Sequence, residues 1–465
     1  MTTILILLLF HIIFVNCTSK IAIIGSGIGG THTAYLLSNS NINSEIHIYE
    51  QSNFSGGRVN TEEFEGKVFE LGAEFFINDN KILVELIQEL KLTKYEKNID
   101  DKSLGLWSGS EQLDFYLGNS LLINLPKLIY RYGLSMYYAK RQMATQLENF
   151  IKIYPELEKG KFFRDLKSLL EFMNLKDMIH IKFEDYLAQE GFYRQFMDEL
   201  LNAVLGSIYN QNIQVNSFTG LITFAALFNK SMGIKEGNNQ LVVQMLQRLQ
   251  KNNSFKLNLN SKVDIIEKTS NGKYIAKTNS GMTNKYDIII IAAPLLKTDI
   301  QFVNVNTSKN VQPKKYVNTH VFVVNSELKY EKFGLRSKAD IPFAIFSYQK
   351  NITNISEFKK LGENLFKVQA ETKVDELELS KYFHNPKIVL YKDWIYAYPK
   401  LDVVNEEELP DFVIDENLYH INAIEAAGSA MEMILISSKN IVNLVLENSR
   451  MKSSTKESKP QNEEL

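Results

Sequence analysis

The sequence predicts an α/β protein in which a Rossmann-type nucleotide-binding domain joins a substrate domain of mixed helix and sheet. Three observations predict this class. The apolar run 21–24 leads directly into a glycine motif at 25–30. Apolar residues recur at helical spacing from Lys81 to about Gly233, and runs typical of strands dominate after that point.

The glycine motif, Gly-Ser-Gly-Ile-Gly-Gly, follows the pattern G-x-G-x-x-G. Gly25 permits the tight turn from strand to helix, Gly27 lets the backbone approach a pyrophosphate, and Gly30 lets the helix pack close to the sheet. The N–H groups that open the helix would hold the phosphates. A second strand, 46–49, ends at Glu50, which can accept hydrogen bonds from ribose hydroxyls. The alternative, a glycine-rich turn in an unrelated sheet, leaves Glu50 unexplained.

The residues after Glu50 distinguish FAD from NAD. The segment 55–58, Ser-Gly-Gly-Arg, resembles the second signature of the amine-oxidase-like FAD flavoproteins. The resemblance implies that Gly57 and Arg58 lie along the pyrophosphate and flavin, and that Gly72 lets the chain pass close to the flavin ring. Arg suits this place because its guanidinium pairs with phosphate oxygens and stays charged; the alternative is a solvated surface charge. Because NAD enzymes usually lack this signature, the sequence favours FAD.

Composition excludes several other classes. The chain has 465 residues, enough for two domains or for one domain with a large insertion. Its formal net charge of −2 argues against a nucleic-acid partner. The seven histidines show no metal-ligand spacing and no Gly-x-Ser-x-Gly nucleophile motif occurs, so we expect neither a metal site nor a serine nucleophile.

The N-terminus has the pattern of a signal peptide over residues 1–17. The apolar run from Ile4 to Val15 is too short to span a bilayer. Val15 and Cys17 fit the small-residue positions of a cleavage site, which predicts cleavage after Cys17 and passage into the secretory pathway; the alternative is a membrane anchor. Cys17 is the only cysteine, so the mature chain would have no disulfide. Sequons for N-glycosylation stand at Asn53, Asn229, Asn252, Asn306, Asn351 and Asn354.

Later elements follow in order. Strands are expected at 263–266 and 286–291, and a substrate-domain sheet from 317 to about 398. Residues 418–446 predict a strand, a glycine-bearing turn and a helix, and the Ser-, Lys- and Glu-rich end from about Arg450 predicts disorder. The predicted bounds are 20–80, 234–300 and 405–447 for the FAD-binding domain, 81–233 and 301–404 for the substrate domain, and 450–465 for the disordered tail.

The segment 418–433, Leu-Tyr-His-Ile-Asn-Ala-Ile-Glu-Ala-Ala-Gly-Ser-Ala-Met-Glu-Met, resembles the C-terminal motif of the prenylcysteine oxidases, called farnesylcysteine lyases in plants. The resemblance covers about residues 20–447. Further matches are the glycine turn ending at Thr31, the Gly-Gly-Arg turn, 69–73, Tyr209, Gln211, Asn216, Phe218, Gly220 and 236–241.

This resemblance implies an FAD-dependent thioether oxidase that is lysosomal or secreted. Its substrate would be S-farnesyl- or S-geranylgeranylcysteine from degraded prenylated proteins. With oxygen as acceptor, the products would be free cysteine, a prenyl aldehyde and hydrogen peroxide. The C1 carbon is allylic and next to sulfur, so loss of a hydride to the flavin leaves a stabilised cation that water attacks. The protein would orient C1 and supply a dry prenyl slot.

The resemblance also assigns residues around the flavin. Glu425 would lie near the ribityl and phosphate region, and Ala430 and Met431 would open a helix whose N-terminus faces the pyrimidine edge. Val263 would contact adenine through its backbone. The alternatives are a surface acid at Glu425 and an ordinary core side chain at Met431. The flavin itself carries the reaction, and the candidates beside its reacting atoms are Gly72, Tyr209 and Gln211.

Four positions depart from the family pattern: Gly206 stands in place of Arg, Ile208 of Asn, Ile77 of His, and Glu74 of a small polar residue. These departures keep two alternatives open. One is an FAD amine or polyamine oxidase, which lacks the C-terminal motif. The other is an inactive, secreted flavin-binding pseudoenzyme.

The segment from Leu121 to Met143 mixes apolar residues with Lys127, Arg131, Lys140 and Arg141. This pattern is typical of an amphipathic surface in peripheral contact with a membrane, where prenyl lipids reside. The alternative is a helix of the substrate domain that packs on its own core.

Overall fold

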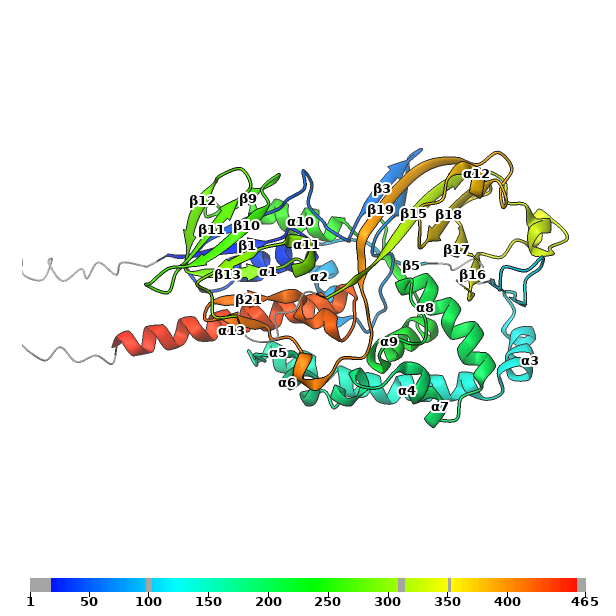
Figure 1. The fold of residues 1–465 in the computed structure, drawn as a ribbon, viewed down its shortest axis with the longest axis horizontal. Helices are drawn as coiled ribbons and strands as arrows, with labels where there is room; N and C mark the ends of the chain where they lie inside the picture. The colour runs from blue at the N-terminus through cyan, green and yellow to red at the C-terminus, as the bar shows by residue number, and fades with distance from the viewer. Residues whose placement is uncertain (1–17, 98–102, 308–313, 350–352, 458–465) are drawn as a thin grey trace, which may run out of the picture.

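The computed structural model describes residues 18–97, 103–307, 314–349 and 353–457. Two parts lie side by side (Figure 1). One is built around a six-stranded sheet, and the other around a seven-stranded sheet above a group of helices. The predicted signal peptide, residues 1–17, lies outside the described residues.

The six-stranded sheet carries the glycine motif. Its order is β20-β21-β13-β1-β2-β9, and all neighbours are parallel except β20 and β21. Ile21, Ala22 and Ile23 are all fully buried, as expected for a strand covered on both faces. The predicted strands 21–24 and 46–49 are confirmed. The strands are β1 Ser19–Ile24, β2 Ser44–Tyr49, β9 Phe255–Asn258, β13 Ile288–Ile291, β20 Val413–Asp415 and β21 Leu418–His420.

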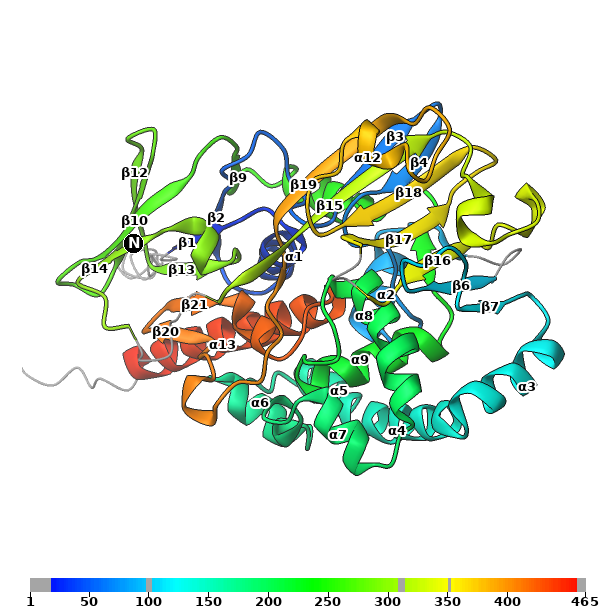
Figure 2. The ribbon, with the colours of Figure 1, turned by 45° about the vertical axis from the view of Figure 1, so that its right-hand side comes forward.

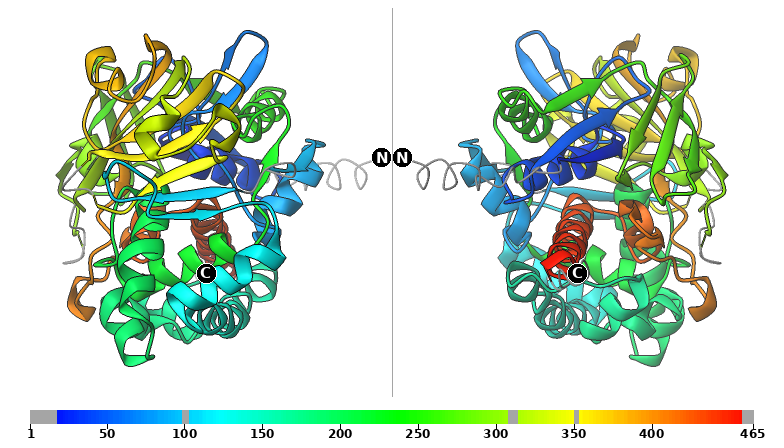
Figure 3. Two further views of the ribbon diagram at one scale, coloured as in Figure 1. Left: turned by 90° about the vertical axis from the view of Figure 1, so that its right-hand side faces the viewer. Right: turned by 90° about the vertical axis from the view of Figure 1, so that its left-hand side faces the viewer.

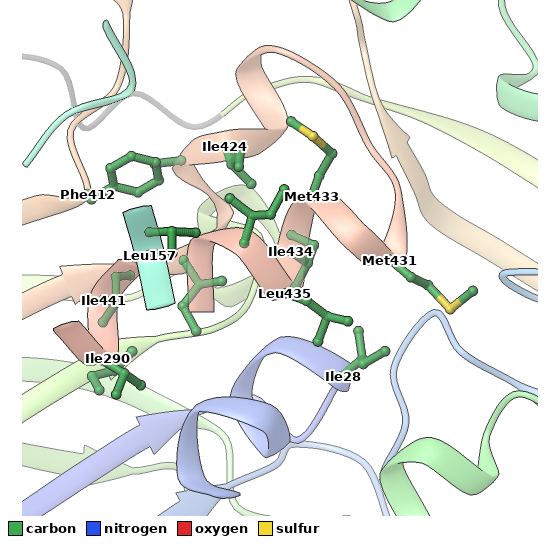
Figure 4. Close-up of a cluster of buried hydrophobic side chains, with 14 of the residues drawn as sticks. Ile28, Leu157, Ile290, Phe412, Ile424, Met431, Met433, Ile434, Leu435 and Ile441 are labelled. Carbon is green, nitrogen blue, oxygen red and sulfur yellow. The ribbon is translucent and has the colours of Figure 1, made fainter. Parts of the chain in front are cut away.

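Helix α1 (Ile28–Ser38) packs against α10 (Gln240–Leu249) and α13 (Met431–Glu457). Buried polar contacts join α1 to α13, since Ser438 Oγ lies 2.9 Å from His32 Nδ1 and 2.8 Å from Thr33 Oγ1. Figure 4 shows the apolar side chains at this junction, where Ile28 of α1 and Ile434 of α13 lie together with Leu157 and Ile290 from the middle of the chain. The glycine motif and the C-terminal motif therefore share one core.

The C-terminal helix is longer than predicted. It begins at Met431, as expected, but continues to Glu457. The prediction of disorder is therefore wrong for residues 450–457. Residues 451–457, Met-Lys-Ser-Ser-Thr-Lys-Glu, continue a helix that tertiary contacts have already nucleated, because Met, Lys and Glu favour a helix and Ser and Thr disfavour it only weakly. Residues 458–465 lie outside the described residues.

A four-stranded sheet in the order β12-β11-β10-β14 lies next to the six-stranded sheet (Figure 1). The strand predicted at 286–291 is divided, because β12 ends at Tyr286 and β13 begins at Ile288. The bounds are β10 Val263–Lys268, β11 Tyr274–Thr278, β12 Thr283–Tyr286 and β14 Gln301–Val303.

The seven-stranded sheet has the order β19-β15-β18-β17-β16-β6-β7. Figure 3 shows its yellow strands above the cyan and green helices. The sheet predicted for 317–398 is confirmed, with β6 and β7 added from an earlier part of the chain. The bounds are β6 Leu104–Trp107, β7 Phe115–Leu117, β15 Tyr316–Asn325, β16 Ala344–Ser347, β17 Ile355–Lys360, β18 Leu365–Ala370 and β19 Lys387–Pro399.

The region 81–233 is mainly helical, as predicted, but four short strands interrupt it. Strands β6 and β7 complete the seven-stranded sheet, and β5 pairs with β8. Segments of three or four residues are too short to show a period of two, so the helical pattern around them dominated the prediction.

The helices of this region are α2 Lys81–Glu89, α3 Leu121–Tyr132, α4 Ser135–Phe150, α5 Ile153–Glu158, α6 Leu166–Phe172, α7 Phe183–Gln189, α8 Asn202–Tyr209 and α9 Ser217–Phe228. The remaining strands are β3 Thr61–Phe64, β4 Lys67–Glu70, β5 Lys94–Glu96 and β8 Met232–Ile234. Short helices stand at Lys176–Ile179, Phe196–Leu201, Leu295–Thr298, Tyr330–Phe333, Lys338–Asp340, Glu376–Leu379 (α12), Glu406–Glu408 and Ile421–Ala426.

Candidate cofactor and substrate site

The two glycine turns lie against each other. Gly27 and Gly56 form a parallel bridge, and the Gly56 N–H donates to the Ser26 carbonyl at 3.0 Å. Gly57 has a φ of +56°, and a Cβ there would lie 3.3 Å from the Gly27 Cα. The G-x-G-x-x-G and Gly-Gly-Arg turns therefore form one continuous backbone surface.

The glycines of the first motif have different neighbours. A Cβ on Gly30 would lie 2.0 Å from the Gly25 carbonyl oxygen, and a Cβ on Gly25 would lie 2.6 Å from the Ala292 carbonyl oxygen. A Cβ on Gly27 would meet nothing closer than 3.9 Å. Gly25 and Gly30 are thus required by the fold, whereas Gly27 leaves open space beside the start of α1. Because no side chain caps α1, its first N–H groups can bind an anion.

Glu50, which follows β2, is hydrogen-bonded to Ser26 in the first glycine motif. Its carboxylate accepts hydrogen bonds from the Ser26 N–H, the Ser26 hydroxyl and the Ser52 N–H, each at 2.9 Å. The Ser261 N–H donates to the Glu50 carbonyl at 2.8 Å, which brings the start of β10 at Val263 beside Glu50. Ser55 Oγ is shielded from solvent and has no hydrogen-bond partner among the described residues. It precedes the Gly-Gly-Arg turn, where a phosphate oxygen would accept a hydrogen bond from its hydroxyl.

A cavity of about 700 Å³ continues from these turns into the space between the seven-stranded sheet and the helices. A Cβ on Gly72 would lie 2.1 Å from the Arg58 carbonyl oxygen, so only glycine fits where the chain borders the cavity. Predicted site residues that line the cavity are Arg58, Gly72, Tyr209, Ala430 and Met431.

Two of the candidates beside the flavin differ in their surroundings. Tyr209 packs its ring against Tyr398 at a centroid distance of 5.5 Å, and burial raises the pKa of Tyr209, so its hydroxyl stays neutral. Gln211 is not a lining residue. Its amide donates to the Pro399 carbonyl at 3.0 Å and accepts from the Leu401 N–H at 2.8 Å. Gln211 therefore stabilises the end of β19 and the residues that follow it.

Arg58 and Glu425 form a buried ion pair, and the Tyr316 hydroxyl donates to the same carboxylate. Glu425 is 1% exposed, which excludes the alternative of a surface acid. Burial opposes the charge on Arg58, but the Glu425 carboxylate outweighs this effect and raises the pKa of Arg58. Sequence reasoning selected the Arg and the Glu separately; it missed their pairing and missed Tyr316, for which no motif gives a signal.

One wall of the cavity is charged. Glu74 binds Lys359 Nζ at 2.5 Å and also binds Lys367, which lies 3.6 Å from Glu357. Burial would raise the pKa of Glu74, but the lysines beside it hold that pKa well below its usual range. Glu74, which stands where the family has a small polar residue, is thus neutralised by two lysines on β17 and β18. The sequence did not predict these lysines as site residues.

The opposite wall is apolar and comes from α4 and α9. Its lining side chains include Met143, Leu147, Phe150, Phe218, Leu221 and Ile222. The departures Ile77 and Ile208 also line the cavity and add apolar surface to it. Gly206 does not line it; its carbonyl accepts from the Asn210 N–H at 3.0 Å within the end of α8.

Glu432, in the first turn of α13, has a structural role. Its carboxylate accepts from the N–H groups of Ile82 at 2.9 Å and Leu83 at 3.0 Å, which stabilises the start of α2. Burial raises the pKa of Glu432 to about 7. Met431 and Met433 are also buried, and Met431 contributes both to the core and to the cavity wall.

The sequence profile of the prenylcysteine lyase family matches residues 117–459. The chain belongs to this family. It is 24% identical over 451 residues to the farnesylcysteine lyase of Arabidopsis thaliana, with 92% of this chain and 88% of that protein covered. It is 25% identical over 453 residues to prenylcysteine oxidase 1 of Homo sapiens, with 90% and 87% covered.

Two further comparisons concern the fold. The profile of an NAD(P)-binding Rossmann-like domain matches residues 23–90. A redesigned putrescine oxidase superposes with a TM-score of 0.63 at 13% identity, covering 93% of this chain and 99% of that chain. Cyclohexylamine oxidase from Brevibacterium oxydans gives 0.62 at 13% identity, covering 93% and 100%. The predicted fold class, a Rossmann-type domain with a mixed substrate domain, is confirmed.

The residues present fit FAD. The uncapped start of α1, the open space at Gly27 and the unpaired Ser55 hydroxyl suit a pyrophosphate, and Glu50 is placed to bind a ribose. Gly72 and the start of α13 then border the cavity that a flavin ring would enter. FAD, the predicted cofactor, is therefore the cofactor that the residues of this site fit.

Proposed function

We propose that the protein oxidises the thioether of S-farnesyl- or S-geranylgeranylcysteine. One equivalent each of thioether, oxygen and water gives free cysteine, a prenyl aldehyde and hydrogen peroxide. The observation that carries this proposal is a cavity with one apolar and one charged wall, bordered by Gly72 and the start of α13, where the flavin ring would enter. The names of the two relatives, farnesylcysteine lyase and prenylcysteine oxidase, support it.

The chain's own residues bind and orient the substrate. FAD supplies a hydride acceptor when it is bound. The side chains of α4 and α9 exclude bulk water around the prenyl chain, which protects the cation left at C1 until one water attacks it. Tyr209 lines the cavity and its hydroxyl stays neutral, so it can donate a hydrogen bond to a bound group. No side chain is required as a nucleophile.

The charged wall suits the head of the substrate. A cysteine head group carries one ammonium and one carboxylate, and the wall offers acids and bases in balance. Glu74 and Glu357 face Lys359 and Lys367 across ion pairs. A zwitterion can join such a cluster without leaving a net buried charge. We therefore assign the cysteine head to this wall and the prenyl chain to the helices opposite.

Anaerobic stopped-flow with the FAD-bound protein tests the proposed function. Farnesylcysteine is expected to bleach the flavin absorbance, and deuterium at C1 is expected to slow the bleaching about twofold or more, because the C1–H bond breaks in that step. Spermine is the matched control for an amine oxidase. Bleaching by spermine but not by farnesylcysteine would establish the amine-oxidase alternative, and bleaching by neither would establish the pseudoenzyme.

The same assay locates the cysteine head. Glu74→Gln is expected to raise KM for farnesylcysteine about tenfold, which corresponds to about 1.4 kcal/mol. KM for farnesyl methyl sulfide, which lacks the head group, should not change. An equal change for both thioethers would show that Glu74 acts only through the fold.

We also propose that the protein enters the secretory pathway and acts in the lysosome or outside the cell. The apolar run 4–15 supports this location, as do the exposed sequons at Asn252 and Asn306. Protein from its native host is expected to begin at Thr18 when its N-terminus is sequenced. An intact Met1 on a cytosolic protein would contradict the proposal.

A further inference from the structure

Helix α3 and the start of α4 present a large apolar surface to solvent. Leu121 is 73% exposed, Leu122 is 88% exposed and Tyr130 is 95% exposed. Figure 2 places α3 at the outer edge of the molecule, away from the six-stranded sheet. The other large apolar side chains exposed here are Ile123, Leu125, Ile129, Leu134, Tyr137 and Tyr138. The alternative that this segment packs on its own core is therefore wrong for these side chains except Tyr138, which also contacts Phe192, and a patch of this kind marks an interaction surface.

The charged residues of this segment itself are all basic, and the acids beside it, Glu199 and Glu190, come from other elements. Residues 121–143 include Lys127, Arg131, Lys140 and Arg141 but no Asp or Glu. Arg131 is held by Glu199 through two hydrogen bonds of 2.7 and 2.9 Å, whereas Lys140 and Arg141 are exposed. An apolar surface with a basic border complements an anionic lipid leaflet, where each basic residue near the surface contributes about 1 kcal/mol.

Helix α4 runs from this surface to the cavity wall. Tyr137 and Tyr138 are exposed at the start of α4, while Met143 and Leu147 on the same helix line the cavity. Tyr138 and Met143 are separated by about 8 Å along the helix axis at 1.5 Å per residue. A prenyl chain that leaves a bilayer at the apolar surface would therefore be close to the apolar wall of the cavity.

We propose that α3 and the start of α4 dock the protein on the surface of an anionic lipid bilayer. A second copy of the chain is a poorer occupant, because a two-fold contact would bring the basic borders of both copies together. No helix among the described residues is long and apolar enough to cross a bilayer. The exposed apolar side chains and the basic residues support the docking surface by themselves. Only the route of the prenyl chain rests on the proposed function.

Co-sedimentation of the FAD-bound protein with vesicles tests the docking surface. The wild type is expected to sediment with vesicles of equal parts phosphatidylcholine and phosphatidylserine, and more weakly with phosphatidylcholine alone. The double variant Leu122→Asp, Tyr130→Asp is expected to lose affinity about tenfold or more, because two exposed apolar side chains that would enter the bilayer interface become charged. Leu377→Asp is the matched control, since Leu377 is 79% exposed on α12 in the other part of the substrate domain.

Three results would overturn the docking surface: no vesicle binding by the wild type, equal weakening by Leu377→Asp, or a change from dimer to monomer in the double variant without an effect on vesicle binding. Flavin content and melting temperature show whether each variant is folded. Oxidation of farnesylcysteine dispersed in detergent should be unchanged in the double variant. If no variant, including the wild type, oxidises it, the proposed function fails while the vesicle result still stands.

Discussion

The substitution Glu425→Ala is expected to lower the free energy of unfolding by about 3 kcal/mol. It removes the partner of Arg58 and leaves a partly buried guanidinium without its counter-charge. Glu425 is almost fully buried, whereas Arg58 keeps 28% of its side chain exposed. The expected cost therefore lies at the low end of the range for breaking a buried ion pair. Urea unfolding of the FAD-bound protein, followed by flavin release, measures it.

Two matched variants separate the charge from the shape. Glu425→Gln keeps the volume and one acceptor for Arg58 and Tyr316, so a smaller loss is expected. Arg58→Met combined with Glu425→Leu removes both charges and is expected to be more stable than Glu425→Ala alone, since neither charge is left unpaired. If the free energy of unfolding of Glu425→Ala lay within about 1 kcal/mol of the wild-type value, another group would have to neutralise Arg58.

The nucleotide-binding part was predictable because its signals are local. The apolar strand at 21–24, the glycines and the acid at Glu50 lie within one short stretch of chain, and each depends on backbone geometry next to it in sequence. The bridge between Gly27 and Gly56 follows from two such motifs. Local motifs with a fixed spacing therefore gave the correct class of fold and the correct cofactor.

The rest of the site could not be predicted because its contacts join distant parts of the chain. Glu74 pairs with Lys359 and Lys367, which follow it in the sequence by 285 and 293 residues. The Tyr316 hydroxyl donates to Glu425, which lies 109 residues further along the chain. The strand β6 pairs in parallel with β16, far along the chain. A single sequence shows that such residues exist but does not show which ones the sheet brings together.

The substitution Gly27→Val is expected to give a folded protein that binds FAD about a hundredfold more weakly, or about 2.7 kcal/mol. Gly27 has an ordinary extended backbone, with φ −67° and ψ −179°, and its Cβ would meet no atom closer than 3.9 Å. The fold therefore tolerates the side chain at a cost of about 1 kcal/mol for the poorer helix start. The valine would occupy the space that the pyrophosphate needs to reach the N–H groups of α1. Flavin fluorescence titration of the apoprotein measures the loss.

Two other glycines show whether the explanation is correct. Gly118→Val is the matched control, because its Cβ would lie 3.6 Å from the nearest atom, Tyr116 Cε1, at a place that does not line the cavity; this variant should fold and keep FAD. Gly30→Ala should instead fail to fold, since its Cβ would lie 2.0 Å from the Gly25 carbonyl oxygen. If Gly27→Val bound FAD as tightly as Gly118→Val, the phosphates would not rest at the start of α1. The pyrophosphate would then have to be held by Ser55 and the Gly-Gly-Arg turn instead.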